Sequence, residues 1–306
     1  MIDKARPVCD YEGSAYRHEF WGAGREYEDA VERVALRHLL PATGRRLIDI
    51  GGGYGRLFPL YEGYEEVVLF DYALSQLRQG RDLWGAGGQE GHPRYTYVAG
   101  DFYTFPFVAG AFDTVVMVRT LHHAVDGAAV LQGVAQIAAP GGTFVLEFAN
   151  KRNLKAMWRY ALRRQDWSPF SPEPVEFVEL NFDFHPRWIC DQLKQAGFTV
   201  QRKRTVSHLR LEWLKRHIPT GVLLAVDRLL QPTGAVVQFS PSVFVRSHAG
   251  SQKAPAPADV LFRCTVCGST QLVDESDALS CTDCGARFAV RDGIYDFKAP
   301  LKEHEG

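Results

Sequence analysis

Short runs of apolar residues alternate with amphipathic stretches along the first 150 residues. Five runs have the composition of buried strands and lie at 45–50, 67–71, 95–101, 112–118 and 141–148. Apolar residues recur at helical spacing over 11–40, 56–61, 73–83 and 128–138. Strands that are apolar on both faces and alternate with helices are typical of a parallel sheet covered on both sides. We therefore predict an α/β fold with a doubly wound, mostly parallel sheet.

The pattern changes after residue 150. In chain order we expect a basic amphipathic helix over 151–164, an irregular proline-rich loop over 165–177, a helix over 185–198, a strand over 198–206, one or two helices over 209–231, and a last strand over 236–247. Pro241 inside that last run predicts an edge strand or a bulge, because proline cannot donate a ladder hydrogen bond. The stretch 251–259 has the composition of a linker.

Length and composition fit one large domain and one small one. Of the 306 residues, 46% are hydrophobic and 23% charged, which is ordinary for a globular protein and excludes disorder as its main state. The apolar runs are far shorter than the roughly 18 residues that span a bilayer, so we expect no transmembrane segment. The first residues, MIDKARPVCDYEG, lack the apolar core of a secretory signal, so we expect a cytoplasmic protein.

The net charge of −1 conceals an asymmetry along the chain. Residues 1–150 carry a net charge of −6, residues 151–257 carry +9 and residues 258–306 carry −4. A basic middle segment suits an anionic substrate. The simpler alternative is that this segment packs beside its own acidic flanks.

A glycine-rich turn follows the first predicted strand. Asp49 leads into it, and Gly51, Gly53 and Gly55 let the backbone turn tightly and approach a ligand closely. A tight connection between a strand and a helix would need some of these glycines even without a ligand. The turn alone is therefore a weak indication of a nucleotide-type cofactor site.

Acidic residues at the ends of the next two strands strengthen that interpretation. Asp71 ends the second strand, where a carboxylate can accept hydrogen bonds from both hydroxyls of a ribose. Asp101 ends the third strand, where it can accept from an exocyclic amine while the neighbouring Phe102 covers a flat ring. Helix N-capping is the alternative role for both carboxylates.

Together these motifs resemble the seven-stranded, class I family of S-adenosylmethionine-dependent methyltransferases. The resemblance covers roughly residues 10–250, and its motifs are LIDIGGGYG (47–55), LFDYALSQL (69–77), GDFYTFPF (100–107), FDTVVMVRTLHH (112–123) and APGGTFVLEF (139–148). A dinucleotide-binding Rossmann domain is the rival, but it usually has G-x-G-x-x-G where this chain has G-x-G-x-G. The resemblance implies one seven-stranded domain over 1–250, with 151–184 and 207–235 as insertions on the substrate side.

The resemblance also implies roles for single residues. It places Asp49 and the glycine turn beside the methionine part of the cofactor, and Asp71 at the ribose hydroxyls. Asp101 would accept from the adenine amino group, with the Phe102 backbone at the adenine ring. Arg119 ends the fourth strand, where the family contacts the amino-acid end of the cofactor.

The N-terminal segment is expected to fold over this cofactor. Tyr16, Trp21 and Arg25 are the residues that we expect to make the contact. Simple core packing of these residues is the alternative.

Two histidines after the fourth strand are the candidate catalytic residues. Transfer of a methyl group from a sulfonium depends on alignment and desolvation, and a general base is needed only when the nucleophile carries a proton. His122 and His123 stand where a substrate would reach them; alternatively, they orient the loop or cap the next helix. No N-P-P-Y-type motif follows this strand, which weakens the case for methylation of the amino groups of bases.

The stretch 151–164 carries six basic residues and no acidic one, interleaved with apolar residues. A membrane-surface helix, a nucleic-acid contact and a substrate lid all fit this pattern. A helix with a solvated basic face is the plainest alternative.

Four cysteines near the C-terminus have the spacing of a metal site. Cys264 and Cys267 form one C-x2-C pair, Cys281 and Cys284 form a second, and 13 residues separate the two pairs. Each pair is followed by glycine and resembles a zinc knuckle. Four thiolates complete the tetrahedral coordination of Zn2+ and leave no open position, which predicts a structural metal. Two disulfides are the alternative, which a chain without a secretory signal disfavours.

The segment 260–306 as a whole resembles the small zinc-ribbon domains found beside some methyltransferases, including the activator subunit of tRNA, rRNA and protein methyltransferases. It lies within residues 258–306, whose net charge of −4 would repel phosphates, so docking on the catalytic domain is favoured over nucleic-acid binding.

We therefore predict an S-adenosylmethionine-dependent methyltransferase with a fused zinc-ribbon domain. A small-molecule or lipid-linked acceptor is the first expectation. RNA is the alternative acceptor, and a non-catalytic scaffold or activator that keeps the fold is the third interpretation. The sequence predicts neither the acceptor atom nor the oligomeric state.

Overall fold

The computed structural model describes residues 6–13, 24–88, 92–250, 256–257 and 259–302. Its helices and 3-10 turns are α1 (Glu26–Leu39), η2 (Phe58–Leu60), α2 (Leu74–Trp84), η3 (Leu121–His123), α3 (Gly127–Ile137), α4 (Leu154–Ala161), α5 (Pro186–Gln195), α6 (Glu212–His217), α7 (Thr220–Leu230) and η4 (Gln231–Ala235). Its strands are β1 (Gly44–Ile50), β2 (Tyr64–Asp71), β3 (Arg94–Ala99), β4 (Phe112–Met117), β5 (Ala138–Ala149), β6 (Val175–Val178), β7 (Asn181–Asp183), β8 (Phe198–Val206), β9 (Ser242–Ala249), β10 (Leu272–Asp274), β11 (Ala278–Cys281), β12 (Arg287–Arg291) and β13 (Ile294–Asp296).

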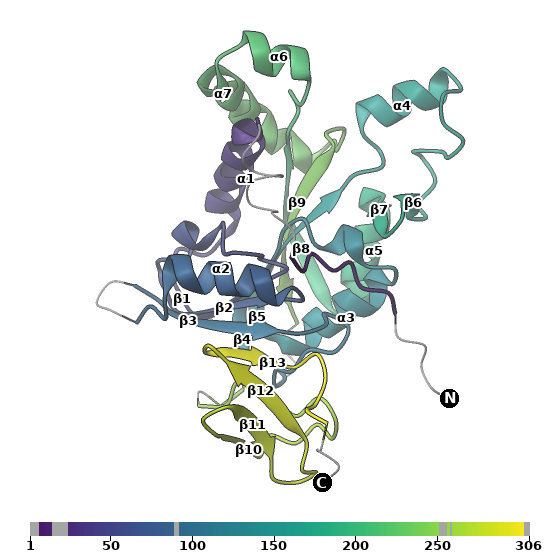
Figure 1. Cartoon of the computed structure of the whole chain (residues 1–306). Helices are drawn as coiled ribbons and strands as arrows, with labels where there is room; N and C mark the ends of the chain where they lie inside the picture. The colour runs from purple at the N-terminus through teal and green to yellow at the C-terminus, as the bar shows by residue number, and fades with distance from the viewer. Residues whose placement is uncertain (1–5, 14–23, 89–91, 251–255, 258, 303–306) are drawn as a thin grey trace.

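Seven of these strands form the predicted doubly wound sheet, in the order β3-β2-β1-β4-β5-β9-β8 (Figure 1). The pairs among β3, β2, β1, β4 and β5 are parallel, whereas β9 is antiparallel to both β5 and β8. The mostly parallel α/β fold is therefore confirmed.

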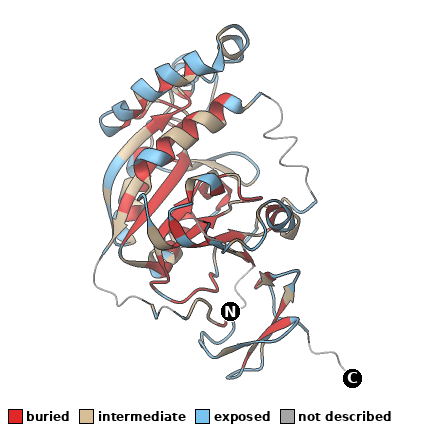
Figure 2. Ribbon diagram, turned by 90° about the vertical axis from the view of Figure 1, so that its left-hand side faces the viewer, coloured by how far each residue is buried: buried red, intermediate tan, exposed pale blue. Residues whose placement is uncertain are grey.

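Helices cover both faces of the sheet. Buried side chains of α1, α2 and α7 share one apolar core with the sheet, and those of α3 and α5 share the other. Figure 2 shows this burial along the central strands, with exposed residues on the outer helices. Among the described residues, each helix is too short or too polar to cross a membrane.

Four C-terminal strands extend the same sheet. The C-terminal module, residues 260–302, contributes β10 to β13, and β13 pairs in parallel with the free edge of β3. The Phe297 N–H donates to the Ala99 carbonyl at 2.8 Å, and Phe262 stacks on Phe107 with ring centroids 5.9 Å apart. Buried side chains of the module, among them Phe288 and Phe297, belong to the core on the α3 side, whereas Ile294 belongs to the core on the α1 side. The module is therefore docked on the sheet, as its charge predicted.

Several local predictions were wrong. Residues 56–61 form only a short 3-10 turn, because Pro59 cannot donate a helical hydrogen bond. The described part of the helix predicted over 11–40 begins at Glu26. The loop predicted over 165–177 runs into a hairpin of β6 and β7.

The prediction from Pro241 was also wrong. The last strand begins one residue after Pro241 and lies inside the sheet between β5 and β8, so the proline marks neither an edge nor a bulge within it. The irregularity instead lies in its partner β8, between Val200 and Arg202.

Candidate cofactor site and cysteine cluster

The glycine turn after β1 is fixed by main-chain contacts and a carboxylate. The Gly51 N–H donates to the Phe70 carbonyl at 2.7 Å, and the Gly53 N–H donates to Asp71 Oδ2 at 2.9 Å. Gly51 has a φ of 68°, and a Cβ atom there would lie 2.2 Å from Thr120 Oγ1. Position 51 therefore requires glycine, because the turn passes against the loop that follows β4.

Asp71 stands at the carboxyl end of β2 and accepts hydrogen bonds on both oxygens. Besides Gly53, the Ala73 N–H donates to Asp71 Oδ1 at 3.0 Å. Burial raises the pKa of Asp71, whereas these N–H groups lower it. Each carboxylate oxygen keeps a second lone pair. Asp71 can therefore accept hydroxyls of a ligand while it holds the turn.

A pocket opens where the carboxyl ends of β1, β2, β3 and β4 meet. The predicted cofactor residues in its lining are Gly51, Gly53, Asp71, Phe102 and Arg119, and the predicted catalytic residue His123 lines it as well. Asp101 lies in the chain between Gly100 and Phe102, which both line the pocket. Its Oδ1 accepts the Tyr103 N–H at 2.8 Å. Gly55 is not among these lining residues; a side chain there would meet Phe58 and Trp84.

Asp49 lines a smaller pocket that adjoins the first one through Gly51, Gly53 and Arg119. Its side chain is buried, and its Oδ2 accepts the Tyr61 hydroxyl at 3.0 Å. Burial raises the pKa of Asp49 to about 7, although the hydrogen bond from Tyr61 lowers it. A cation beside Asp49 would favour its ionised form.

Arg119 is held by a buried charge network that the sequence did not reveal. Its Nε donates to Glu32 Oε1 on α1 at 2.7 Å, and its backbone N–H donates to Glu147 Oε2 on β5 at 2.9 Å. Glu32 also accepts from Arg56 at 2.9 Å. The φ of Arg119 is 57°, a strained conformation that is common at functional sites. The available signal was Glu32 itself, an acid on the apolar face of α1.

The N-terminal segment crosses the first pocket. Val8, Cys9 and Tyr11 belong to the pocket lining. The predicted Tyr16 and Trp21 lie outside the described residues, and Arg25, at the start of α1, belongs to neither lining. The N-terminal segment therefore covers the pocket, but the described residues that do so, Val8, Cys9 and Tyr11, are not the predicted ones.

His123 is bonded through both ring nitrogens. The Leu180 carbonyl lies 3.1 Å from Nδ1, and the Tyr11 hydroxyl lies 3.1 Å from Nε2. Because a carbonyl only accepts, Nδ1 carries the proton and Nε2 accepts from Tyr11. Burial lowers the pKa of His123, and burial together with His123 holds the pKa of His122 well below its usual range. Both rings are therefore neutral near pH 7.

Asp183, at the end of β7, is a titratable residue that is not among the predicted site residues. The Phe184 N–H donates to the Ala149 carbonyl at 2.8 Å, which ties this segment to the end of β5. Burial raises the pKa of Asp183 to about 6, with Lys151 and Glu147 as the charges that act on it. Within the described part of the chain, its carboxylate accepts no hydrogen bond.

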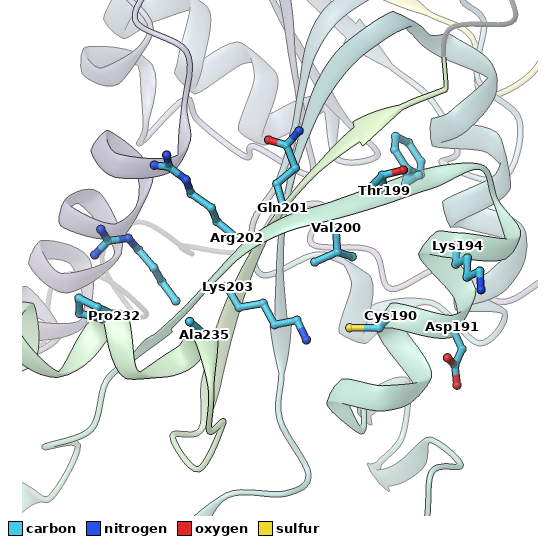
Figure 3. Close-up of a pocket in the computed structure, with 12 residues that line it drawn as sticks. Cys190, Asp191, Lys194, Thr199, Val200, Gln201, Arg202, Lys203, Pro232 and Ala235 are labelled. Atoms are coloured by element: carbon cyan, nitrogen blue, oxygen red, sulfur yellow. The ribbon is translucent and has the colours of Figure 1, made fainter.

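A separate groove follows the sheet edge along β8. Lys194, Arg202 and Lys203 stand in its lining beside Cys190 and Pro232 (Figure 3). None of the predicted cofactor residues belongs to this lining. It is a cationic surface apart from the cofactor pocket.

The four cysteines come together in the C-terminal module. Their four sulfur atoms lie within 4.8 Å of one another. Cys264 Sγ is 3.7 Å from Cys284 Sγ, and Cys267 Sγ is 3.6 Å from Cys281 Sγ. Sulfur atoms this far apart are not bonded as disulfides, whose S–S distance is about 2 Å.

Comparison with known proteins identifies the class to which this fold and pocket belong. The sequence profile of a methyltransferase domain matches residues 16–203, more than half of the chain. The chain belongs to this family and is an S-adenosylmethionine-dependent methyltransferase.

Curated relatives are methyltransferases as well. The ubiquinone/menaquinone biosynthesis C-methyltransferase UbiE of Stutzerimonas stutzeri is 28% identical over 208 residues, which is 66% of this chain and 77% of the relative. The 27-O-demethylrifamycin SV methyltransferase of Amycolatopsis mediterranei is 27% identical over 138 residues, 44% of this chain and 51% of the relative.

Two solved structures share the fold. A chain from the complex of the Haloferax volcanii Trm112 methyltransferase activator with a methyltransferase has a TM-score of 0.53 at 17% identity; the match covers 77% of this chain and 96% of that one. A methyltransferase from Thermotoga maritima has a TM-score of 0.52 at 16% identity, covering 78% and 97%. At these identities the likeness concerns the fold alone.

Proposed function

We propose that this methyltransferase acts on a small-molecule or lipid-linked acceptor. The observation that carries the proposal is the cover over the cofactor pocket, where Tyr11 bonds to His123 and closes one side. Such a covered pocket suits a small acceptor better than a polynucleotide. The relatives named for quinone and rifamycin methylation support the same class.

We assign the cofactor contacts from the two adjoining pockets. Asp71 would accept the ribose hydroxyls, and Gly100 and Phe102 would flank the adenine, with Asp101 as acceptor for its amino group. Asp49 and Arg119 line the second pocket, where the amino-acid end would lie. When bound, the cofactor supplies a methyl group on a sulfonium whose leaving group is neutral. The intact turn, Asp71 and Asp101 argue against the non-catalytic alternative.

Binding of S-adenosylmethionine should weaken as Asp49 becomes protonated. The pKa of Asp49 is about 7 in the free site, and the charges of the ligand should lower it. A carboxyl whose pKa falls on binding favours the complex at high pH, so affinity should drop about tenfold between about pH 8 and pH 6. Calorimetry at both pH values measures this change. In Asp49→Asn the drop should disappear, which also controls for titration of the ligand itself; an unchanged drop would contradict the assignment.

Asp183 is our proposed general base for an acceptor that carries a proton, in place of the predicted His122 and His123. The nitrogen lone pair of His123 is already engaged by Tyr11, and His122 binds protons weakly. Asp183 ends β7, which the Phe184 N–H ties to the end of β5, and the charges of Lys151 and Glu147 act on its carboxylate. With a pKa of about 6, this carboxylate is ionised at pH 7. It would take the proton from the acceptor O–H or C–H as the new bond to the methyl group forms.

Replacing Asp183 with asparagine should therefore lower kcat about 10²- to 10⁴-fold, the usual contribution of a general base. In the wild type, kcat should fall below about pH 6, because the base must be unprotonated. Steady-state kinetics across pH checks both expectations. Asp191→Asn, an exposed carboxylate on α5, is the matched control. If the acidic limb persists in Asp183→Asn, another group is the base.

The acceptor class can be tested with a labelled methyl group. We expect label from S-adenosylmethionine to enter a polyprenyl hydroquinone or a simple phenol and to partition into organic solvent. Label that enters bulk RNA in preference to these acceptors would support the alternative substrate and overturn the proposal.

We also propose that the cysteine cluster holds one structural Zn2+. Tetrahedral coordination with Zn–S bonds of about 2.3 Å places the sulfur atoms about 3.8 Å apart. The two measured separations of 3.7 Å and 3.6 Å fit that geometry. A metal here would link the two cysteine-bearing turns and brace the C-terminal module against β3.

A further inference from the structure

Helix α4 stands away from the sheet (Figure 1). It carries large apolar residues that are exposed to solvent. Leu154 and Trp158 are 64% and 68% exposed, and Leu162 follows four residues later, 44% exposed. Spacing of four residues places all three side chains along one stripe of the helix. Among the residues of α4, only Ala156 is buried. The apolar stripe is therefore uncovered.

A row of cations runs beside this stripe. Lys155, Arg159 and Arg163 each follow one residue after an apolar member, and Arg164 comes next. Within the described part of the chain, no carboxylate lies within 4.0 Å of any of these four residues. Their charge is not neutralised within the fold and is available to an anionic surface.

The rest of the same insertion adds exposed apolar side chains. Phe170 is exposed and meets the Tyr160 ring with a centroid distance of 6.2 Å. Phe177 and Val178, on β6, are exposed as well. Exposure of this many apolar side chains to water is energetically unfavourable. The surface therefore indicates a partner that offers an apolar region beside anionic groups.

We propose that α4 docks this protein on a bilayer surface that contains anionic lipids. A helix with tryptophan and leucine on one face and a row of lysine and arginine beside it is typical of interfacial helices. Tryptophan favours the headgroup region, and the cations lie where lipid phosphates would be. Single-stranded RNA fits less well, because the neighbours of Trp158 on the stripe are leucines, which offer no ring to a base, and the nearby Tyr160 and Phe170 rings contact each other.

The docking is separable from the cofactor assignment. It rests on the proposed function in one respect, since a lipid-linked acceptor would enter the pocket from the bilayer. Vesicle binding itself needs neither the cofactor nor turnover. A failure to dock would therefore leave the methyltransferase assignment standing, and the two outcomes can be distinguished.

The groove along β8 supplies a matched control. Its lining includes Lys194, Arg202 and Lys203 (Figure 3), a triplet of cations that can be compared with Arg159, Arg163 and Arg164 of the α4 segment. No large exposed apolar side chain stands in that lining. If charge alone attracted the protein to anionic vesicles, removing either triplet would have the same effect.

Flotation of the full-length protein with vesicles tests the proposal. We expect binding to phosphatidylcholine vesicles that contain phosphatidylglycerol, and weak binding without it. The triple variant Arg159→Ala, Arg163→Ala, Arg164→Ala should bind the anionic vesicles roughly a hundredfold more weakly, at about fivefold for each cation. Trp158→Ala should weaken binding about tenfold or more, because it removes the apolar anchor.

The control variant Lys194→Ala, Arg202→Ala, Lys203→Ala should bind nearly as the wild type does. In every variant, S-adenosylhomocysteine should still raise the melting temperature, which shows that the fold is intact. Absence of vesicle binding in the wild type, or equal losses in the two triple variants, would overturn the proposal. So would sub-micromolar RNA binding at physiological salt that is lost in the α4 triple variant.

Discussion

Replacing Asp71 with alanine should lower the affinity for S-adenosylhomocysteine about a hundredfold or more. The variant loses one or two charge-assisted hydrogen bonds to the ribose, each worth about 1.5–3 kcal/mol. It also releases the Gly53 and Ala73 N–H groups, which lie 2.9 Å and 3.0 Å from the carboxylate, so the turn itself loses its anchor. Isothermal calorimetry measures the change directly.

Asp82→Ala is the matched control for this experiment, because Asp82 is an exposed carboxylate on the same helix-bearing segment and is not among the pocket-lining residues. Its affinity should equal that of the wild type. If Asp71→Ala bound the ligand as tightly as Asp82→Ala does, the assignment of the ribose site would be wrong.

Replacing Cys281 with serine should remove the zinc and unfold the C-terminal module. The free energy of binding at a structural zinc site is on the order of 10 kcal/mol and is also folding free energy. Loss of that contribution is comparable to the whole stability of a small domain. Elemental analysis should fall from one zinc per chain to nearly none, and the melting temperature should fall as well.

Because the module pairs with β3, its unfolding should also expose part of the catalytic domain. Without β13, the edge of β3 loses a partner, and Phe107 loses its contact with Phe262. We therefore expect Cys281→Ser to aggregate more readily, because an unpaired edge strand beside an apolar patch invites association. Cys190→Ser, on α5 and not a member of the cluster, should keep both zinc and solubility. A full zinc content in Cys281→Ser would contradict the proposed site.

The periodic parts of the fold were predictable because local pattern and tertiary burial agree there. The strand predicted over 198–206 is β8 with the same bounds, and the stretch 73–83 is α2 shifted by one residue. The residues at the ends of β1 and β2 could be foreseen for the same reason. Parallel strands bring their carboxyl ends to one edge of the sheet, where Gly51, Gly53 and Asp71 meet.

Contacts between distant segments were beyond the sequence. Glu32 and Arg119 are 87 residues apart, and their contact depends on how α1 packs over the turn. Similarly, the pairing of β13 with β3 joins a segment that follows a linker-like stretch to the far edge of the sheet. Neither arrangement leaves a periodic signal in the residues that take part.

The bond between Tyr11 and His123 is the corresponding case in the pocket. Nothing in the pattern around Tyr11 distinguishes it from other aromatic residues near the N-terminus, and we had expected Tyr16 and Trp21 to cover the cofactor. The bond also changes the interpretation of His123, because it occupies the nitrogen that a general base would need. The chemistry of His123 depends on its contact with Tyr11, and the sequence around His123 does not reveal that contact.

Native mass spectrometry of the purified full-length protein, with S-adenosylhomocysteine added, tests the central claim most directly. We predict a single species in which each chain carries one zinc ion and one nucleoside ligand. Chelation should remove the zinc, and Asp71→Ala should remove only the nucleoside. A wild-type chain that carries neither ligand, with its mass unchanged by added S-adenosylhomocysteine, would contradict both assigned sites.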